Sequence, residues 1–210
     1  MQASTLSETS IIVFDGRSNY LQQLNMKSGT VTQMNEFNDE MKEKTFTTVF
    51  LGGFVYVLTA RPSNMHRLKF SDPSASWEQI PGLNNDHGSQ PVAVAASGLI
   101  ILAGASGWKF SKSVTTYDPS RNRWGKMKSK QLATSSLANV ASKGFIYCIG
   151  GGTESGGLTN RVERLHIASQ SWVEVAPMHE TRYKAYAVAC SGKIFAAGGR
   201  DRTDKKSIEK

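Results

Sequence analysis

Five apolar segments of strand length recur along the chain, and they restrict its fold more than any other feature of the sequence. Each ends in small residues, and successive segments begin 44 to 48 residues apart. They are Thr9–Gly16 (TSIIVFDG), Gly53–Ala60 (GFVYVLTA), Gly98–Ala105 (GLIILAGA), Gly144–Gly151 (GFIYCIGG) and Gly192–Gly199 (GKIFAAGG). Self-similarity at a fixed period of this length indicates a repeat architecture, in which similar units stack on one another.

A second pattern has the same period. A large apolar residue is followed seven residues later by Trp or Val, and three residues after that by another apolar residue. This spacing gives Leu24–Val31–Met34, Phe70–Trp77–Ile80, Tyr117–Trp124–Met127 and Leu165–Trp172–Val175. A short apolar run also precedes each of the later glycines, and no segment has a sustained period of 3.6 residues. The sequence therefore predicts an all-β fold with four strands in each unit.

The details of the repeat resemble a kelch β-propeller. The Trp-Asp dipeptide of WD40 repeats is absent, whereas a glycine pair closes the second strand, Tyr-Asp stands in the third strand and Trp opens the fourth. The matching residues are Gly150, Gly151, Gly198, Gly199, Tyr117, Trp77, Trp124 and Trp172. The resemblance implies a kelch-type β-propeller in which these residues are structural.

Counting units predicts a partial ring of about 4.5 four-stranded blades, where a closed ring would have about six. The first blade is expected to lack its innermost strand, and the fifth to be truncated inside its third strand. The expected blades are residues 9–37, 45–83, 90–129, 136–178 and from 184 onward. We therefore expect the chain to be part of a longer protein.

The glycines around residue 151 also invite comparison with a phosphate-binding loop, but the details disagree. Gly151 and Gly156 have the spacing of a Walker loop, yet Gly157 and Leu158 follow where Lys and Ser or Thr are required. Ser155 stands where the dinucleotide fingerprint needs its third glycine. The sequence predicts no cofactor.

Catalysis and metal binding have little support in the sequence. The four histidines show no H-E-x-x-H spacing, and there is no G-x-S-x-G motif. We therefore predict a chain without catalytic or metal-ligating residues. A kelch-scaffold enzyme, such as a sugar epimerase or an oxidase, is the less favoured alternative.

Charge and composition bear on partners and compartment. The net charge of +8 is scattered over the chain, so no nucleic-acid partner is expected. The N-terminal residues do not resemble a signal peptide, and no apolar run is long enough for a membrane span. Cys148 and Cys190 each lie in an apolar run and are predicted to be buried free thiols. The simplest expected localisation is cytoplasmic.

Loops between propeller strands are the expected place for binding. We expect two loop sets on one face, one after each second strand and one between blades. The candidate binding residues are Arg17, Asn19, Arg61, Asn64, His87, Trp108, Lys109, His179, Arg182, Tyr183, Arg200 and Arg202. Such a mixture suits a polar or acidic peptide, with Trp108 and Arg182 as anchors. The alternative is that these are only polar loop residues.

Three segments resemble the propeller of animal Kelch-like proteins more closely. They are Tyr117–Met127 (YDPSRNRWGKM), Val175–Gly199 (VAPMHETRYKAYAVACSGKIFAAGG) and Lys205–Lys210 (KKSIEK). In that family the propeller captures a substrate protein, and BTB and BACK domains, absent from this chain, recruit a cullin ubiquitin ligase. The resemblance thus implies a substrate adaptor of a cullin-RING ligase. An actin-binding or cytoskeletal kelch protein is the alternative.

Overall fold

The computed structural model describes residues 2–7, 10–14, 20–37, 46–59, 64–70, 72, 74–82, 92–105, 110–201 and 207–210. The chain divides into two compact units, Met1–Leu83 and Asn84–Lys210, which are considered separately. The described residues form antiparallel strands and turns and include no helix. The predicted all-β class is therefore confirmed.

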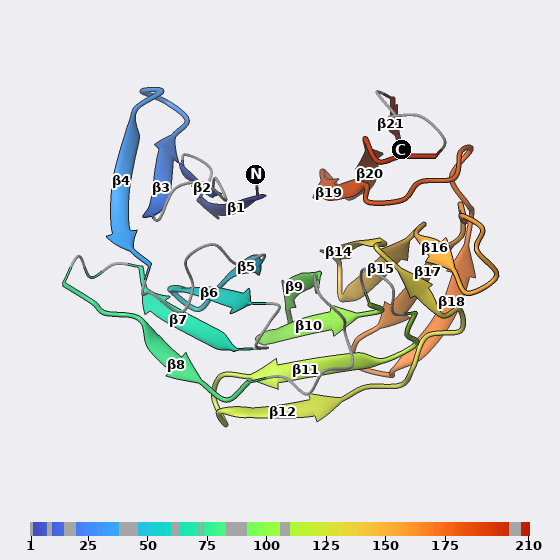
Figure 1. Cartoon of the computed structure of the whole chain (residues 1–210), viewed down its shortest axis with the longest axis horizontal. Helices are drawn as coiled ribbons and strands as arrows, with labels where there is room; N and C mark the ends of the chain where they lie inside the picture. Colours follow the sequence, from blue (N-terminus) through green and yellow to red (C-terminus); the bar gives the residue numbers. More distant parts are fainter. Residues whose placement is uncertain are drawn as a thin grey trace. The chain divides into compact units, whose positions relative to one another are not determined.

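The first unit contains two four-stranded sheets (Figure 1). Sheet 1 consists of β1 (Gln2–Ser7), β2 (Ser10–Phe14), β3 (Tyr20–Asn25) and β4 (Val31–Glu36). Sheet 2 consists of β5 (Phe46–Leu51), β6 (Phe54–Thr59), β7 (Met65–Lys69) and β8 (Glu78–Ile80). Strands follow chain order in both sheets, and β1 lies against β5.

The innermost strand of sheet 1 differs from the sequence-based expectation. The pattern predicts none in this blade, but β1 pairs antiparallel with β2, with Ala3 opposite Val13. The segment was missed because its sequence, QASTLS, is mostly small and polar and has no apolar run. A strand held by backbone hydrogen bonds to its neighbour does not need one.

The second unit contains three larger sheets and a two-stranded one. Sheet 3 consists of β9 (Ala93–Ala96), β10 (Leu99–Ala103), β11 (Val114–Asp118) and β12 (Arg123–Lys126). Sheet 4 consists of β14 (Ala138–Ser142), β15 (Phe145–Ile149), β17 (Val162–His166) and β18 (Ser171–Val175). Sheet 5 consists of β19 (Tyr186–Cys190), β20 (Lys193–Ala197) and β21 (Ile208–Glu209). The short pair is β13 (Thr134–Ser135) with β16 (Gly152–Thr153).

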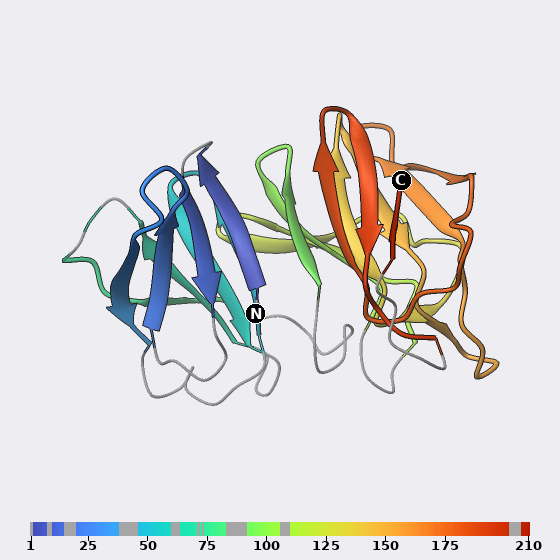
Figure 2. The ribbon, with the colours of Figure 1, turned by 90° about the horizontal axis from the view of Figure 1, so that it is seen from above.

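Neighbouring sheets of the second unit pack face to face. Their innermost strands are adjacent, with β14 next to β9 and to β19, and Figure 2 shows the first hairpins of sheets 4 and 5 side by side. Because both faces of such a sheet are covered, its second strand is buried at consecutive positions, and Ile100, Ile101 and Leu102 of β10 are all fully buried. This is how blades pack in a β-propeller.

Three apolar clusters of described residues fill spaces between sheets within the two units. One lies between sheets 1 and 2 and contains Leu21, Phe37, Val55, Val57 and Leu68, with Trp77 packed against it. A second, between sheets 3 and 4, contains Ile101, Ala103, Val114, Leu137, Ile146, Cys148, Leu165 and Ile167, with Trp172 packed against it. A third, between sheets 4 and 5, contains Ala138, Val140, Ile149, Val162, Met178 and Ala196.

The seven-residue spacing found in the sequence has a simple structural meaning. Tyr117 lies directly opposite Trp124, and Leu165 lies directly opposite Trp172, across the hairpin that joins the third and fourth strands. The rings of Tyr117 and Trp124 are 5.3 Å apart between centroids. Side chains in such pairs share one face, so both residues pack toward the same neighbouring sheet.

Candidate functional site

The loops at one end of the second unit are connected by backbone hydrogen bonds from sheet to sheet. Ser136 N donates to Ala105 O at 2.8 Å, which links sheets 3 and 4. Lys184 N then donates to Ser136 O at 2.9 Å, and Tyr183 and Arg200 form an antiparallel bridge, which extends the connection to sheet 5. We call residues 104–105, 110–111, 134–136, 150–153, 182–184 and 199–200 the loop platform.

The glycine pairs allow these loops to approach closely. Gly151 has φ +104°, and its N–H donates to Arg182 O at 2.8 Å. A Cβ at Gly151 would lie 2.6 Å from Ser135 O, and one at Gly150 would lie 2.5 Å from Arg182 O. A side chain at either position would force the loops apart, so these glycines position the platform. Gly198 (φ +65°) and Gly199 (φ +84°) occupy the corresponding place in sheet 5.

Two half-buried aromatic residues flank the short β13–β16 pair on this platform. A Cβ at Gly152 would be 3.7 Å from the rings of both Phe110 and Tyr183, so both rings lie close to this glycine. Lys184 Nζ lies 5.5 Å from the centroid of the Tyr183 ring, and Arg200 is exposed beside it. Phe110, Tyr183, Lys184 and Arg200 therefore form an aromatic and basic patch, a combination suited to binding peptides.

In sheets 4 and 5, a glutamate on the third strand accepts hydrogen bonds from the loop that leads into that sheet. Glu163 accepts hydrogen bonds from the backbone N–H groups of Gln131 and Leu132, at 2.9 and 3.2 Å. Glu209 accepts them from the corresponding groups of His179 and Glu180. The two glutamates are equivalent, because Glu163 lies opposite Cys148 in sheet 4 and Glu209 opposite Ala196 in sheet 5.

Each glutamate also has a buried cation, but the cation comes from a different position. In sheet 5, Arg182 Nε donates to Glu209 Oε1 at 2.9 Å, and its other nitrogens bond Gly198 O and Ser207 Oγ. In sheet 4, Lys130 Nζ lies 3.8 Å from Glu163 Oε2 and donates to Thr134 Oγ1 and Leu132 O. Sheets 4 and 5 can be aligned by their repeat, in which equivalent residues are 48 positions apart. In this alignment Arg182 is equivalent to Thr134, and Met178 is equivalent to Lys130.

Burial and hydrogen bonding shift the pKa values of these groups. Burial lowers the pKa of Lys130, although Cys148 and Glu163 oppose the shift. Burial acts to raise the pKa of Glu209, but bonds from the His179 N–H and the Arg182 guanidinium outweigh it, so that pKa lies below its ordinary value. Both cations and Glu163 are almost wholly buried, so these groups position loops rather than meet a ligand.

The structure describes five of the twelve candidate binding residues. Tyr183 and Arg200 meet on the platform, and the His179 side chain is 91% exposed. Arg182 is fully buried, so the expectation that its guanidinium is exposed for binding is not met. Asn64, in the other unit, uses its backbone to bond Thr59. The remaining candidates, Arg17, Asn19, Arg61, His87, Trp108, Lys109 and Arg202, lie outside the described residues.

Several platform residues were missed by the sequence analysis. Phe110 follows the two candidates Trp108 and Lys109 directly, and its aromatic character in a loop was the available signal. Lys184 follows Tyr183 and has φ +57°, an uncommon conformation for a residue other than glycine. The roles of Glu163 and Glu209 depend on contacts with residues about 30 positions earlier, which no local pattern reveals.

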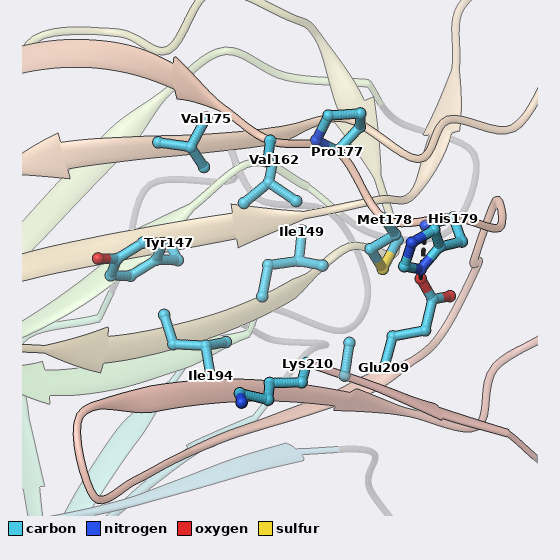
Figure 3. A pocket seen from close by; sticks show the side chains of 12 residues that line it. Tyr147, Ile149, Val162, Val175, Pro177, Met178, His179, Ile194, Glu209 and Lys210 are labelled. Carbon is cyan, nitrogen blue, oxygen red and sulfur yellow. Dashed lines mark hydrogen bonds and ion pairs between the residues drawn. The ribbon is translucent and has the colours of Figure 1, made fainter.

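A separate pocket opens between sheets 4 and 5 (Figure 3). Its walls are apolar and include Tyr147, Ile149, Val162, Ile194 and Ala196, and at its edge His179 Nδ1 lies 3.2 Å from Glu209 Oε2. Its volume of about 160 Å³ is below the roughly 300–1,000 Å³ of sites for drug-sized molecules. The pocket therefore suits a single side chain.

Neither a metal site nor a membrane-spanning helix is found in the described part of the chain. No group of three or more His, Cys, Asp or Glu side chains there could hold a metal ion. None of its segments forms a helix long and apolar enough to cross a membrane.

Comparison with known proteins agrees with this architecture. Residues 133–179 match the model of the Kelch motif, and this segment contains all four strands of sheet 4. The kelch motif and the stacked antiparallel sheets together give the architecture of a kelch-type β-propeller, the fold class that the sequence predicted.

The chain is similar to several Kelch-like proteins. It is 31% identical to Kelch-like protein 40a of Danio rerio over 83% of this chain and 34% of that protein. It is 28% identical to Kelch-like protein 23 of Homo sapiens over 77% of this chain and 30% of that protein. Kelch-like protein 40 of Xenopus tropicalis is 27% identical over 68% of this chain and 23% of that protein. The chain thus spans about a quarter to a third of the length of these relatives.

A solved structure shows the same fold at lower identity. The structure of YjhT superposes with a TM-score of 0.78 at 15% identity, over 94% of this chain and 71% of that one. At this identity the likeness concerns the fold alone.

Proposed function

We propose that the chain is a non-catalytic protein–protein interaction module that captures its partner on the loop platform. The observation that carries the proposal is the patch of Phe110, Tyr183, Lys184 and Arg200, which is held by backbone bonds from three sheets. Aromatic residues and arginine are enriched at the energetic centres of interfaces. A rigid support lowers the entropic cost of binding, because the patch is already ordered.

The chemistry of the patch favours a peptide with acidic and apolar residues. Lys184 and Arg200 attract carboxylates, and the half-buried rings of Phe110 and Tyr183 offer apolar contact. By its likeness to Kelch-like proteins, we further propose that the chain acts in the cytoplasm as the substrate-recognition propeller of a cullin-RING ligase adaptor. The cullin would be reached through BTB and BACK domains.

The test compares two tyrosines that lie three residues apart. Tyr183 lies on the platform, whereas Tyr186 is 66% exposed on the open face of sheet 5. Proteins captured from a cell extract by the wild-type chain, Tyr183→Ala and Tyr186→Ala are quantified by mass spectrometry. We expect Tyr183→Ala to reduce capture of the specific partner about tenfold or more, and Tyr186→Ala to leave it unchanged. Equal capture by all three chains would contradict binding on the platform.

The ligase role is tested separately. The chain is joined to BTB and BACK domains and expressed in cells, with the chain alone as the control. We expect a cullin to be captured only with the fusion, and the partner only when Tyr183 is intact. Co-sedimentation of the chain with actin filaments, without any cullin capture, would instead support the cytoskeletal alternative.

A further inference from the structure

The outermost strand of sheet 3, β12, lies within a basic segment of the sequence (Figure 1). No Asp or Glu occurs between Asp118 and Glu154. The segment Ser120–Lys130 (SRNRWGKMKSK) contains five Lys or Arg residues, of which Lys130 is buried. The other four are exposed: Arg121, Arg123, Lys126 and Lys128. Positive charge therefore gathers along the outer edge of this sheet.

Three of these four cations have no anionic partner among the described residues. Arg121 Nη1 lies 2.7 Å from Asp118 Oδ2, so its charge is compensated. No ion pair to a described residue involves the others, which are Arg123, Lys126 and Lys128. The equivalent of Lys126 in sheet 4, 48 residues later, is Glu174, which accepts a hydrogen bond from Arg161 Nε at 2.8 Å. The strand β12 therefore carries net positive charge where β18 carries an ion pair.

The backbone of Lys126 is turned outward as well. Met127 N donates to Val114 O at 2.9 Å, so these opposite residues form a hydrogen-bonded pair of the ladder between β11 and β12. Such pairs alternate with non-bonded pairs along an antiparallel ladder, and Lys126 opposite Thr115 is the next pair. The N–H and C=O of Lys126 therefore point away from β11, and no hydrogen bond joins them to a described residue. The edge thus offers a partner both a donor and an acceptor.

We propose that β12 is a second interaction surface, which binds an acidic, extended segment of a partner protein as an added strand. The backbone of the segment pairs with the outward N–H and C=O of Lys126, as in other cases of β-augmentation. Lys128 is held at the end of this edge, because its N–H donates to Gln170 Oε1 and its C=O accepts from Trp172 Nε1. Lys126 and Lys128 lie roughly 7 Å apart along the strand. Carboxylates at alternate positions of the segment can therefore face both lysines.

The chemistry of the edge favours a polypeptide over two other occupants. A nucleic acid neutralises the cations, but its phosphodiester backbone has no donor for the C=O of Lys126. A second copy of this edge would bring like charges together, which is how lysines on edge strands prevent self-pairing. An acidic strand satisfies both backbone groups and the charge. The surface is separate from the loop platform, because β12 shares no residue with it.

The test uses a fluorescently labelled peptide of alternating Glu and Val, about eight residues long. It is titrated into the intact chain, and binding is followed by fluorescence anisotropy. The control peptide carries N-methyl groups on its backbone amides, which keeps the charge and removes the donors. We expect saturable binding that is about tenfold or more weaker for the methylated peptide. Absence of saturable binding at about 1 mM, or equal binding of the two peptides, would overturn the proposal.

Matched charge variants locate the site. Lys126→Glu gives β12 the residue that β18 has as Glu174, so it suits an exposed position of an outermost strand, and thermal melts check the fold. It should weaken peptide binding about tenfold or more, whereas Lys193→Glu, at an exposed lysine of β20, should bind as the wild type does. Equal weakening by both variants would attribute the binding to the net charge of the chain and refute the site.

Two further measurements separate this edge from other anion-binding surfaces. Tyr183→Ala should leave peptide binding unchanged, and a loss with Tyr183→Ala rather than Lys126→Glu would place the peptide on the loop platform and contradict the proposal. A single-stranded oligonucleotide with the same charge should not displace the peptide at equal concentration. Displacement would overturn the assignment, because the edge would then bind anions without regard to their backbone.

Discussion

The indole nitrogen of Trp172 in β18 lies 2.7 Å from the backbone oxygen of Lys128, so sheet 4 is hydrogen-bonded to sheet 3 through its outermost strand. We expect Trp172→Ala to lower the free energy of unfolding by about 3–5 kcal/mol, because it empties part of the inter-sheet cluster. Trp172→Phe keeps much of the apolar contact and should cost less. Chemical denaturation of both variants measures the difference. A loss below about 1 kcal/mol for Trp172→Ala would show that the ring does not support the interface.

The two cation arrangements suggest an exchange experiment. Lys130→Met leaves Glu163 buried without its cation, and we expect a loss of about 3 kcal/mol in unfolding free energy. Adding Thr134→Arg gives sheet 4 the Met and Arg that sheet 5 has at the equivalent positions, Met178 and Arg182. This second substitution should recover most of the lost stability. Urea denaturation of the two single variants and the double variant checks the coupling. Additive losses in the double variant would contradict the equivalence of the two sites.

Stability should fall at acidic pH through Glu209. Its pKa in the folded chain lies below the ordinary value of 4.5, so its stabilising contribution is complete above pH 4.5 and is lost as the pH falls through the folded-state pKa. Glu209→Gln should therefore reduce stability at pH 7 and flatten its dependence on pH below 4.5. Glu154→Gln is the matched change of charge at an exposed turn residue. Parallel pH profiles for Glu209→Gln and the wild type would contradict the assigned role.

The two cysteines should differ in reactivity. Burial raises the pKa of Cys148 to about 12, whereas Cys190 is exposed on β19, contrary to the buried position expected from its apolar neighbours. We expect iodoacetamide to modify Cys190 in the folded chain and Cys148 only after unfolding. Peptide mapping by mass spectrometry identifies the modified thiol. Rapid modification of Cys148 without denaturant would show that the interface between sheets 3 and 4 is open.

The repeat made most strands predictable, because second strands such as β6 and β10 are buried on both faces and are therefore mainly apolar. The strand β1 could not be predicted in this way, because it is held by backbone pairing with β2 and has no apolar run. Arg182 was expected at the surface because it lies in a loop. Its guanidinium is instead buried, where it forms a hydrogen-bonded ion pair with Glu209, 27 residues later. Pairings over such distances are properties of the fold and cannot be read from local sequence.

The open face of sheet 5 should promote association of the chain. Tyr186, Val188 and Ile208 are more than half exposed there, although their counterparts in sheet 4, Ala138, Val140 and Val162, are buried against sheet 5. We expect Val188→Lys to reduce self-association in sedimentation experiments, because it places a charge within this apolar face. Val31→Lys, at another exposed valine, is the control. A monomeric wild-type chain at high concentration would contradict this expectation.

The most direct test of the account is hydrogen exchange of the chain with and without the partner that the wild type captures. If the loop platform binds the partner, exchange should slow at residues 182–184 and 199–201 and around Phe110, and Tyr183→Ala should abolish the effect. Protection confined to β19 and β21, with the platform exchanging at the rate of the free chain, would contradict it.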